Sequence, residues 1–370
     1  MEDLIAVLTS WSVQFMAALV FLYVLLKSFK RVRYTAGKRP PGPPSLPLIG
    51  HLHHLLFGLP HHSFTKIAEK YGPIVWLEVG ALRLVVVTSS DIAREVLKTQ
   101  DHIFASRPPG IMTDLVFNKG QDLVFSPLND NFRRARKVFT TELLSQKRID
   151  SFKDIISAGA ETTPDTIVRA ITELVRHPNI IERLQSELDD VIGKERLVEE
   201  ADLNNLEYLQ AVVKETLRLH TVVGLGIPHF STEATKVSGY DIPANTQVML
   251  NYYAINRDAK VWKNPLKFDP SRFLNSPVDV RGHHYVLLPF GAGRRRCPGM
   301  NLALVNVAYN IAQLIHACPI SLPEGLTHLD VDVEEKFGMT VARGNPLNLL
   351  IKRRLPLDVY RRAGLQLSGV

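Results

Sequence analysis

A single cysteine in a glycine-rich loop is the strongest chemical signal in the sequence. Cys297 lies within residues 290–299, which contain three glycines and directly precede an apolar helical run over 302–315. Glycines let the backbone turn tightly and bring amide N–H groups toward the sulfur, and the start of the following helix favours a charged thiolate. The pattern predicts a thiolate ligand for iron. Arg295 could pair with a porphyrin carboxylate, and Phe290 could pack against the macrocycle.

Five residues of this loop resemble the haem-binding signature of the cytochromes P450, the haem-thiolate monooxygenases: Phe290, Gly293, Arg295, Cys297 and Gly299. The resemblance implies haem b (iron protoporphyrin IX) as the cofactor and Cys297 as the axial ligand of its iron. The alternative is that Cys297 is a small buried apolar residue beside a basic loop. Cys318 has no such neighbours, and we expect it to be an ordinary core residue.

Two arginines and a glutamate form a second motif. Glu215 and Arg218 are three positions apart and share one face of a predicted helix, and Arg272 lies in the irregular segment 268–273. Alone, such an i,i+3 pair is usually a solvated surface pair worth a few tenths of a kcal/mol, about 0.2–0.5. Together the three resemble the family's Glu-Arg-Arg structural triad, which would fix the core behind the cysteine loop.

The segment 158–163, Ala-Gly-Ala-Glu-Thr-Thr, is similar to the oxygen-activation segment of the family's long central helix. The resemblance implies that Glu161 recruits or relays protons and that the Thr162 hydroxyl holds a water molecule or the oxygen. The residues also allow a helix start, with Thr162 or Thr163 as the N-cap and Asp165 in the first turn. Pro164 favours that alternative because proline suits a first turn.

Two further segments are similar to the family's contacts to the haem propionates. They contain Arg136, in the run 132–136, and His229, which follows Pro228. Phe132 stands where the family usually has tryptophan, so one indole N–H donor is lacking. Without the resemblance, an arginine or histidine at these positions would be interpreted as a surface group.

The elements that must position these residues are mainly helical, with a smaller β portion. The resemblance implies the cytochrome P450 fold. Alternating and β-branched residues predict a hairpin through Gly80 and Ala81, and Ser89 or Ser90 offers an N-cap for a helix through Val96. The predicted strands are 74–79, 82–87, 246–251 and 347–351, and the longer predicted helices are 180–192, ended by Gly193, and 206–219.

The N-terminal region predicts a membrane anchor. Residues 4–26 carry no charge, and 23 residues are long enough to cross a hydrocarbon core. Glu2 and Asp3 precede this run and six lysines and arginines follow it, which places the body on the cytoplasmic side. Prolines at 40–44 predict a stiff spacer. We expect an anchor over 1–26, a basic and proline-rich linker over 27–44, and a haem-thiolate monooxygenase domain over 45–370.

Two alternatives to an anchor are a cleaved signal peptide and a buried core helix. A signal peptide usually has a shorter apolar region, with its positive charges before that region. The resemblance is greatest to plant-type microsomal members and implies a single-pass protein of the endoplasmic reticulum membrane.

Composition excludes other classes of protein. The chain has 370 residues, 45% of them hydrophobic, and a net charge of +7, with six of the excess positive charges at 27–39. This concentration argues against a nucleic-acid surface. Two cysteines cannot form a disulfide scaffold or a four-thiolate zinc site.

The interval between two of the motifs is unexpectedly short. Phe132 and Ala158 are 26 positions apart, whereas the family has a much longer interval there. We expect an internal deletion near 152–153. It would remove the helices that roof the substrate pocket and the first half of the central helix.

The resemblance implies a haem-dependent monooxygenase that inserts one oxygen atom of O2 into a small lipophilic, secondary-metabolite-like substrate. Electrons would come from an NADPH-dependent reductase, a flavoprotein docking near Cys297, where Arg294, Arg295 and Arg296 supply positive charge. The alternative for Arg294 and Arg296 is a solvated basic turn. Segments 111–117, 222–227 and 337–341 are candidates for lining the pocket. The alternatives are a non-catalytic membrane-tethered haem-binding remnant, an unstable splice or gene-model product, or a basic membrane-surface scaffold.

Overall fold

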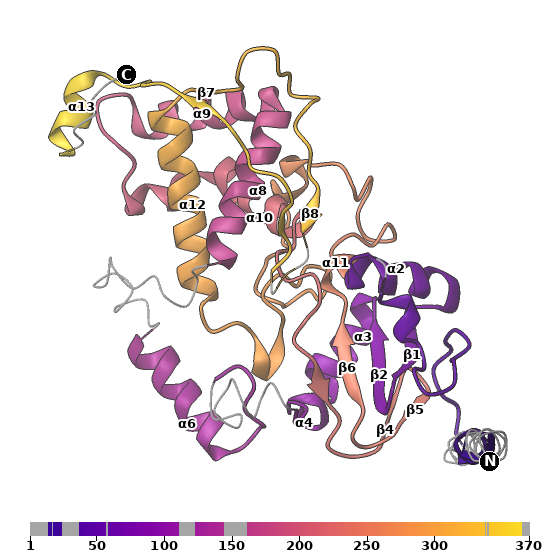
Figure 1. The fold of residues 1–370 in the computed structure, drawn as a ribbon. Helices are drawn as coiled ribbons and strands as arrows, with labels where there is room; N and C mark the ends of the chain where they lie inside the picture. Colours follow the sequence, from indigo (N-terminus) through magenta and orange to yellow (C-terminus); the bar gives the residue numbers. More distant parts are fainter. Residues whose placement is uncertain are drawn as a thin grey trace, which may run out of the picture.

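The computed structural model describes residues 14–16, 18–23, 37–56, 58–110, 123–143, 161–336, 338 and 340–364. These residues are mainly helical, with a smaller sheet portion, as the sequence predicted. A helical part and a sheet part lie side by side, and the polypeptide passes between them several times (Figure 1).

The main sheet has four strands in the order β1-β2-β6-β3. The predicted hairpin is confirmed: β1 (Ile74–Val79) pairs antiparallel with β2 (Leu82–Val87), and Gly80 at the turn has a positive φ of 60°. β2 runs parallel to β6 (Gln247–Leu250), and β6 pairs antiparallel with the short β3 (His229–Phe230).

Alternation along β1 and β2 directs side chains to two separate apolar clusters. On one face, Val75 and Leu77 pack with Phe64 of α2 (Pro60–Tyr71). On the other, Ile74 and Trp76 pack with residues of α3 (Ser90–Arg94) and of α11 (Tyr252–Ile255). Both faces of the sheet are therefore covered.

Four long helices form the largest apolar core; they contain the predicted segments 180–192 and 302–315, and the predicted segment 206–219 begins one residue before its helix. They are α8 (Thr162–Arg176), α9 (Pro178–Ile192), α10 (Glu207–Leu219) and α12 (Met300–Ala317). α12 packs against the other three, and its first residue comes three positions after Cys297 (Figure 1). Gly193 ends α9 with a φ of 78°, as expected for a glycine C-cap.

Shorter elements connect these parts. The short helices are η1 (Leu52–His54), η2 (Glu95–Thr99), α4 (Asp101–Phe104), α6 (Asp130–Val138), η4 (Phe139–Leu143), η6 (Glu200–Asn205), η7 (Pro270–Phe273), η8 (Gly293–Arg295) and α13 (Leu357–Arg362). The remaining strands are β4 (Thr235–Val237) with β5 (Tyr240–Ile242), β7 (Ile320–Ser321) with β10 (Leu350–Ile351), and β8 (Glu335–Lys336) with β9 (Ala342–Arg343).

The predicted anchor and the predicted deletion fall mostly outside the described residues. Of the segment 1–26, residues 14–16 and 18–23 are described, and they are helical and exposed. Among the helices that the structure describes, none is long and apolar enough to cross a membrane. The transmembrane helix therefore stays a prediction. The junction at 152–153 also lies in a part of the chain without described coordinates.

Candidate functional site

The cysteine loop is held in shape by backbone contacts and by glycines in the left-handed region. The amide of Cys297 donates to the carbonyl of Phe290 at 2.9 Å, which closes the loop on itself. Gly291 and Gly293 have φ values of 66° and 67°. A Cβ at Gly293 would collide with the carbonyl oxygen of Leu97 in η2, so no larger residue fits there. Steric exclusion therefore explains why this position is glycine.

Opposing influences act on the thiol of Cys297. Burial raises the pKa of the thiol above its ordinary value. A hydrogen bond from the Gly299 amide and the charges of Arg136 and Arg296 lower that pKa, without cancelling the effect of burial. The sulfur also lies just before the first residue of α12, where the helix dipole favours negative charge. Its surroundings therefore support a thiolate once a cation displaces the proton.

Arg136, Arg295 and Phe132 meet beside the cysteine loop. Arg136 on α6 donates to the carbonyl of Arg296 at 2.6 Å, which ties this helix directly to the loop. Arg295 donates to the carbonyls of Ala105 at 2.6 Å and Ser126 at 2.5 Å. Its guanidinium also lies over the ring of buried Phe132, 3.8 Å from the centroid. The phenylalanine that replaces the expected tryptophan thus makes a cation–π contact instead of donating an indole N–H.

His229 lies next to two arginines but is itself uncharged. Its Nδ1 lies 2.9 Å from the carbonyl of Phe104, so Nδ1–H is the donor and Nε2 is left as an acceptor. Burial and the nearby charges of Arg107 and Arg295 lower the pKa of His229 to about 3, although the hydrogen bond to Phe104 opposes this. The structure thus places neutral His229 in a cluster with Arg107 and Arg295.

Arg107 joins this cluster, and the sequence did not indicate it. Its side chain is buried and donates to the carbonyls of Ile227 at 2.8 Å and Pro228 at 2.9 Å, directly before His229. The only local signal was an arginine followed by two prolines, in a segment with no helical or strand periodicity.

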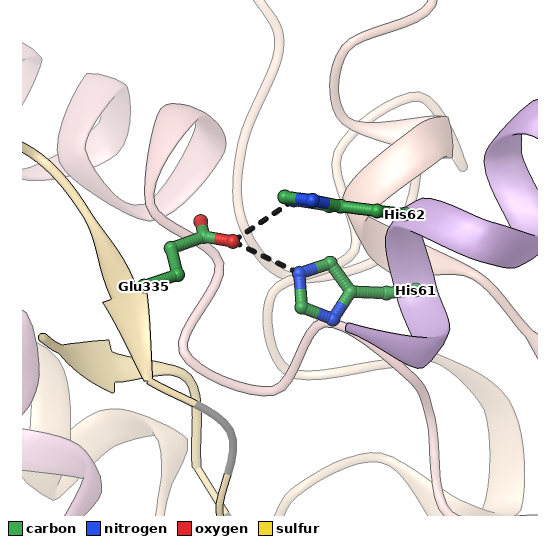
Figure 2. Close-up of side chains that lie close together, drawn as sticks. All are labelled: His61, His62 and Glu335. Carbon is green, nitrogen blue, oxygen red and sulfur yellow. Dashed lines mark hydrogen bonds and ion pairs between the residues drawn. The ribbon is translucent and has the colours of Figure 1, made fainter. Parts of the chain in front are cut away.

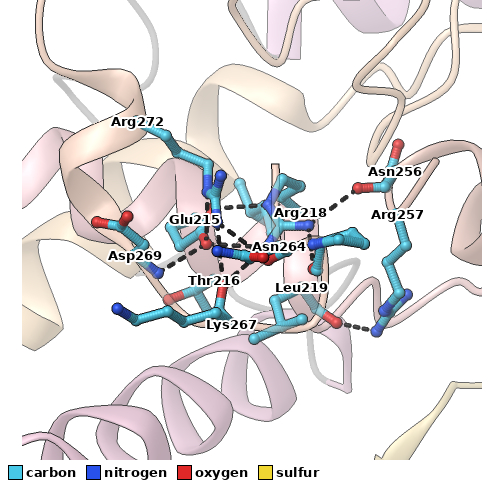
Figure 3. A network of polar contacts seen from close by, with 12 residues as sticks. Glu215, Thr216, Arg218, Leu219, Asn256, Arg257, Asn264, Lys267, Asp269 and Arg272 are labelled. Atoms are coloured by element: carbon cyan, nitrogen blue, oxygen red, sulfur yellow. Dashed lines mark hydrogen bonds and ion pairs between the residues drawn. The ribbon is translucent and has the colours of Figure 1, made fainter. Parts of the chain in front are cut away.

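The predicted triad forms one buried network (Figure 3). Arg218 makes a bidentate pair with Glu215, at 2.7 and 2.8 Å, and Arg272 donates to the same carboxylate at 3.0 Å. The amide of Asp269 supplies a fourth donor at 2.8 Å. Both Glu215 and Arg218 have fully buried side chains. Arg218 also donates to three backbone carbonyls, those of Asn256, Pro265 and Lys267.

Glu161 and Thr162 lie at the first described turn of α8. Glu161 is exposed and occupies the N-cap position without a side-chain capping bond, Thr162 is half-buried, and Pro164 falls in the first turn. Residues 158–160 lie outside the described part. The Thr340 hydroxyl donates to Asp165 at 2.7 Å, so Asp165 binds a distant segment near the start of this helix.

Two of the three predicted pocket segments lie together. The amide of Val341 donates to the carbonyl of Val222 at 2.8 Å, which joins the segment 340–341 to 222–227 near the start of α8. The third segment, 111–117, lies outside the described residues, as do Phe337 and Met339. These two candidate segments therefore lie together at one end of α8.

A family model described as Cytochrome P450 matches the chain over residues 40–157 and 150–347. The chain belongs to the cytochrome P450 family. It is similar to plant members of this family: melianol synthase of Azadirachta indica is 28% identical over 495 aligned positions, which cover 93% of this chain and 98% of that protein. Salviol synthase of Salvia pomifera is 30% identical over 486 positions, with coverage of 91% and 97%.

Solved cytochrome P450 structures share the fold. A zebrafish cytochrome P450 with abiraterone superposes with a TM-score of 0.69 at 22% identity, over 80% of this chain and 100% of that chain. As a cytochrome P450, the chain is a monooxygenase whose cofactor is haem iron, with NADPH-derived electrons delivered through a reductase.

The donor set around Cys297 fits a cytochrome P450 haem. A single sulfur at a helix N-terminus suits one axial thiolate, and the guanidinium groups of Arg136, Arg295 and Arg107 provide the charge that two propionates require. His229 would donate to a propionate only after taking up a proton or exchanging its tautomer.

Sequence reasoning missed a buried polar stripe on α8. Arg169 donates to the carbonyls of Val333 and Ala342, both at 2.9 Å, and thereby holds the β8–β9 hairpin against the helix. One turn later, Glu173 lies 2.7 Å from the Nε2 of buried His220. Burial alone would raise the pKa of Glu173, but the bond and charge of His220 lower it below the ordinary value. Polar residues at helical spacing within an otherwise apolar segment were the available signal.

Proposed function

We propose that Cys297 is the axial ligand of a haem iron and that the chain is a haem-dependent monooxygenase acting on a small lipophilic, secondary-metabolite-like substrate. The observation that carries this proposal is the position of the sulfur. It lies at the start of α12, accepts a hydrogen bond from Gly299 and is tied to α6 through Arg136. Relatives named as synthases of melianol and salviol support a substrate of plant secondary metabolism.

The residues around the site have distinct proposed roles. Bound haem supplies the activation of O2 that places one oxygen atom in the substrate and releases the other as water, with two electrons from the reductase. Arg136, Arg295 and His229 orient the propionates. Phe290 and the glycines at 293 and 299 fix the sulfur and limit the access of water to it. Glu161 brings protons to the site from solvent, and the Thr162 hydroxyl passes them on.

Three residues are proposed to act by structure alone. Glu215, Arg218 and Arg272 join α10 to the segment 264–273 and hold the core behind the cysteine loop. Their network supports this role because each donor and acceptor in it is paired without involving the loop itself.

We further propose a single-pass anchor over 1–26, a linker over 27–44 and a catalytic domain over 45–370 on the cytoplasmic side of the endoplasmic reticulum membrane. A group of exposed apolar side chains just after the linker supports contact of the body with lipid. Single exposed leucines are common on protein surfaces, but a group of them usually marks an interaction surface. The group consists of Leu46, Leu48, Ile49, Leu52 and Leu56.

The chain is proposed to be shortened near 152–153 relative to other cytochromes P450. Two observations support this. The family model matches in two stretches that meet at 150–157, and the alignments to the plant relatives are longer than the 370 residues of the chain. The same shortening favours a second candidate, a membrane-tethered haem-binding remnant without turnover, because a pocket without its roof admits water.

The carbon monoxide difference spectrum of the reduced, purified chain tests the haem proposal. We expect the band typical of thiolate-ligated iron, its loss in Cys297→Ser and its retention in the matched control Cys318→Ser. Retention of the band in Cys297→Ser would exclude Cys297 as the ligand. Substrate-dependent consumption of NADPH then separates the enzyme from the remnant, which binds haem without turnover.

Thr162→Ala should divert electrons to peroxide, and an unchanged yield of product per NADPH would contradict the proposed role of Thr162 in passing on protons.

A further inference from the structure

Two adjacent histidines and one glutamate converge between α2 and β8, and none of the three belongs to the proposed haem site (Figure 2). His61 and His62 lie in the first turn of α2, and Glu335 lies on β8, more than 270 positions later in the chain. The Nε2 atoms of both histidines are 3.0 Å from the same carboxylate oxygen, Oε2 of Glu335. Neighbouring residues on a helix do not normally face one another, so a shared partner is an unusual arrangement.

The spacing of the three donor atoms matches one face of a tetrahedral metal site. All three lie within 4.8 Å of one another. Zinc–nitrogen and zinc–oxygen bonds of about 2.0–2.2 Å place tetrahedral ligand atoms about 3.3 Å apart. Each histidine nitrogen is 3.0 Å from the carboxylate oxygen, and the two nitrogens are no more than 4.8 Å apart, so binding needs small shifts of the side chains. Two histidines and one glutamate also form a recognised zinc donor set that leaves the fourth position to water.

One nitrogen in the cluster has an ion-pair contact but no hydrogen bond among the described residues. The Nε2 of His62 is shielded from solvent, yet it makes no hydrogen bond to any described residue despite its 3.0 Å distance from Glu335. His61 is fully enclosed, with its carbonyl held by Asn251 and Thr65, whereas the His62 ring is 39% exposed. The cluster therefore has two anchored ligands and one ligand that borders solvent, which gives an ion a route of entry.

We propose that His61, His62 and Glu335 bind a divalent transition metal ion of the zinc type. The ion joins α2, the first helix that packs on the sheet, to the β8–β9 hairpin. That hairpin is in turn held to α8 by Arg169. The site is therefore a structural cross-link between the sheet part and the helical part.

The charge around the cluster sets the expected strength of binding. Glu335 contributes the only carboxylate, and the Arg257 guanidinium acts on it electrostatically from nearby. Arg257 is held over the ring of Tyr253, 3.5 Å from the centroid, and donates to the carbonyls of Tyr253 and Leu219. Its positive charge opposes a dication, so affinity should be moderate.

Titration of the full-length chain, purified without a histidine tag, with Zn²⁺ alone tests the site by calorimetry. We expect one equivalent to bind saturably and the chain to unfold at higher temperature when Zn²⁺ is present. His62→Gln and Glu335→Gln should each weaken this binding by about tenfold or more and reduce the thermal shift at a fixed Zn²⁺ concentration. Glu335→Gln keeps the shape of the side chain, and His62→Gln alters a ring at the edge of the fold, so the two variants differ in their structural cost.

A similar cluster on the surface provides the matched control. His283 lies 2.9 Å and His284 3.9 Å from Asp279, but these groups do not form a compact donor set. His283→Gln should therefore leave both the one-equivalent binding and the thermal shift unchanged. The proposal is overturned if the natural chain shows no saturable binding of Zn²⁺, or if His62→Gln and Glu335→Gln bind it as tightly as the natural chain does.

Discussion

At the scale of single residues, burial decides what an ion pair contributes. Glu215–Arg218 and Asp130–Arg133 are both i,i+3 pairs on helices, but the first pair is fully buried, whereas the side chains of the second are 76% and 61% exposed. Arg218→Met leaves the Glu215 carboxylate buried with fewer donors. We expect it to lower the free energy of unfolding by about 3–5 kcal/mol, as for other broken buried pairs.

Urea denaturation measures this difference, and Arg133→Met is the matched control. The control should change the free energy of unfolding by less than about 0.5 kcal/mol, because solvent screens the exposed pair. Similar losses for Arg218→Met and Arg133→Met would contradict a dominant role for burial.

His229 makes stability depend on pH. Its pKa is about 3 in the folded chain, chiefly because of burial and secondly because of Arg107, against an ordinary value of 6.5. Below pH 6.5 the unfolded chain takes up a proton that the folded chain refuses. The resulting stability is fully present above pH 6.5 and is lost as the pH falls toward 3.

His229→Gln should reduce the slope of unfolding free energy against pH by up to about 1.4 kcal/mol per pH unit between pH 6 and pH 4. Chemical denaturation over this range measures the slope. Between pH 7.5 and 8.5 His229 is neutral in both states, so the substitution should not alter the slope there. An unchanged slope at acid pH would show that His229 does not contribute to it.

At the scale of elements, the turn before Cys297 depends on Gly293. Gly293→Ala introduces a Cβ that collides with the Leu97 carbonyl, and it also forces alanine into a positive φ. We expect loss of the thiolate band in the carbon monoxide difference spectrum. Gly239 has a φ of 78° with open space around it, so Gly239→Ala carries only the conformational cost of about 1–2 kcal/mol and should keep the band. Loss of the band in both variants would assign the effect to backbone strain alone.

Local signals in the sequence were sufficient for some elements and not for others. The hairpin 74–87 and the helix ending at Gly193 were predicted because alternation, periodicity and glycine conformation act within a few residues. Arg169 and His220 were missed because their partners lie far along the chain, at Val333 and Ala342 for one and Glu173 for the other. Such contacts depend on tertiary packing, which composition and spacing do not encode.

The cysteine loop shows the same limit. The tight turn at its glycines, the choice of its sulfur as a candidate ligand and its position before a helix could be predicted from the residue types and their spacing. That the Arg295 side chain would donate to Ala105 and lie over Phe132 could not, because α4, α6 and the loop meet only in the folded chain.

At the scale of the whole molecule, the cysteine loop lies where the two apolar cores meet. Leu287 and Phe290 pack with the helical cluster, whereas Leu288 and Ala292 pack with the sheet cluster. Different residues of one short segment, just before Cys297, thus pack with both parts of the protein. This packing explains how the side of the site that carries Cys297 can be held in place even when the proposed deletion removes helices from the opposite side.

The two ends of α12 differ in the positive charges around them, which affects where a redox partner can dock. Near its start, Arg294 and Arg296 accompany the exposed cations Arg133, Arg134 and Lys137 of α6, whereas its last turn packs near α13 (Figure 1). Asp101 pairs with Arg294 at 3.2 Å and partly neutralises it.

We therefore expect Arg296→Ala to slow reduction by an NADPH-dependent reductase more than Arg294→Ala does, most strongly at low salt, because charges at the rim of an interface act on association rates. Stopped-flow reduction measures the rate, haem content should not change, and Arg361→Ala on α13 should have no effect. Equal slowing by Arg361→Ala, or parallel loss of haem and rate in Arg296→Ala, would place the reductase elsewhere on the molecule.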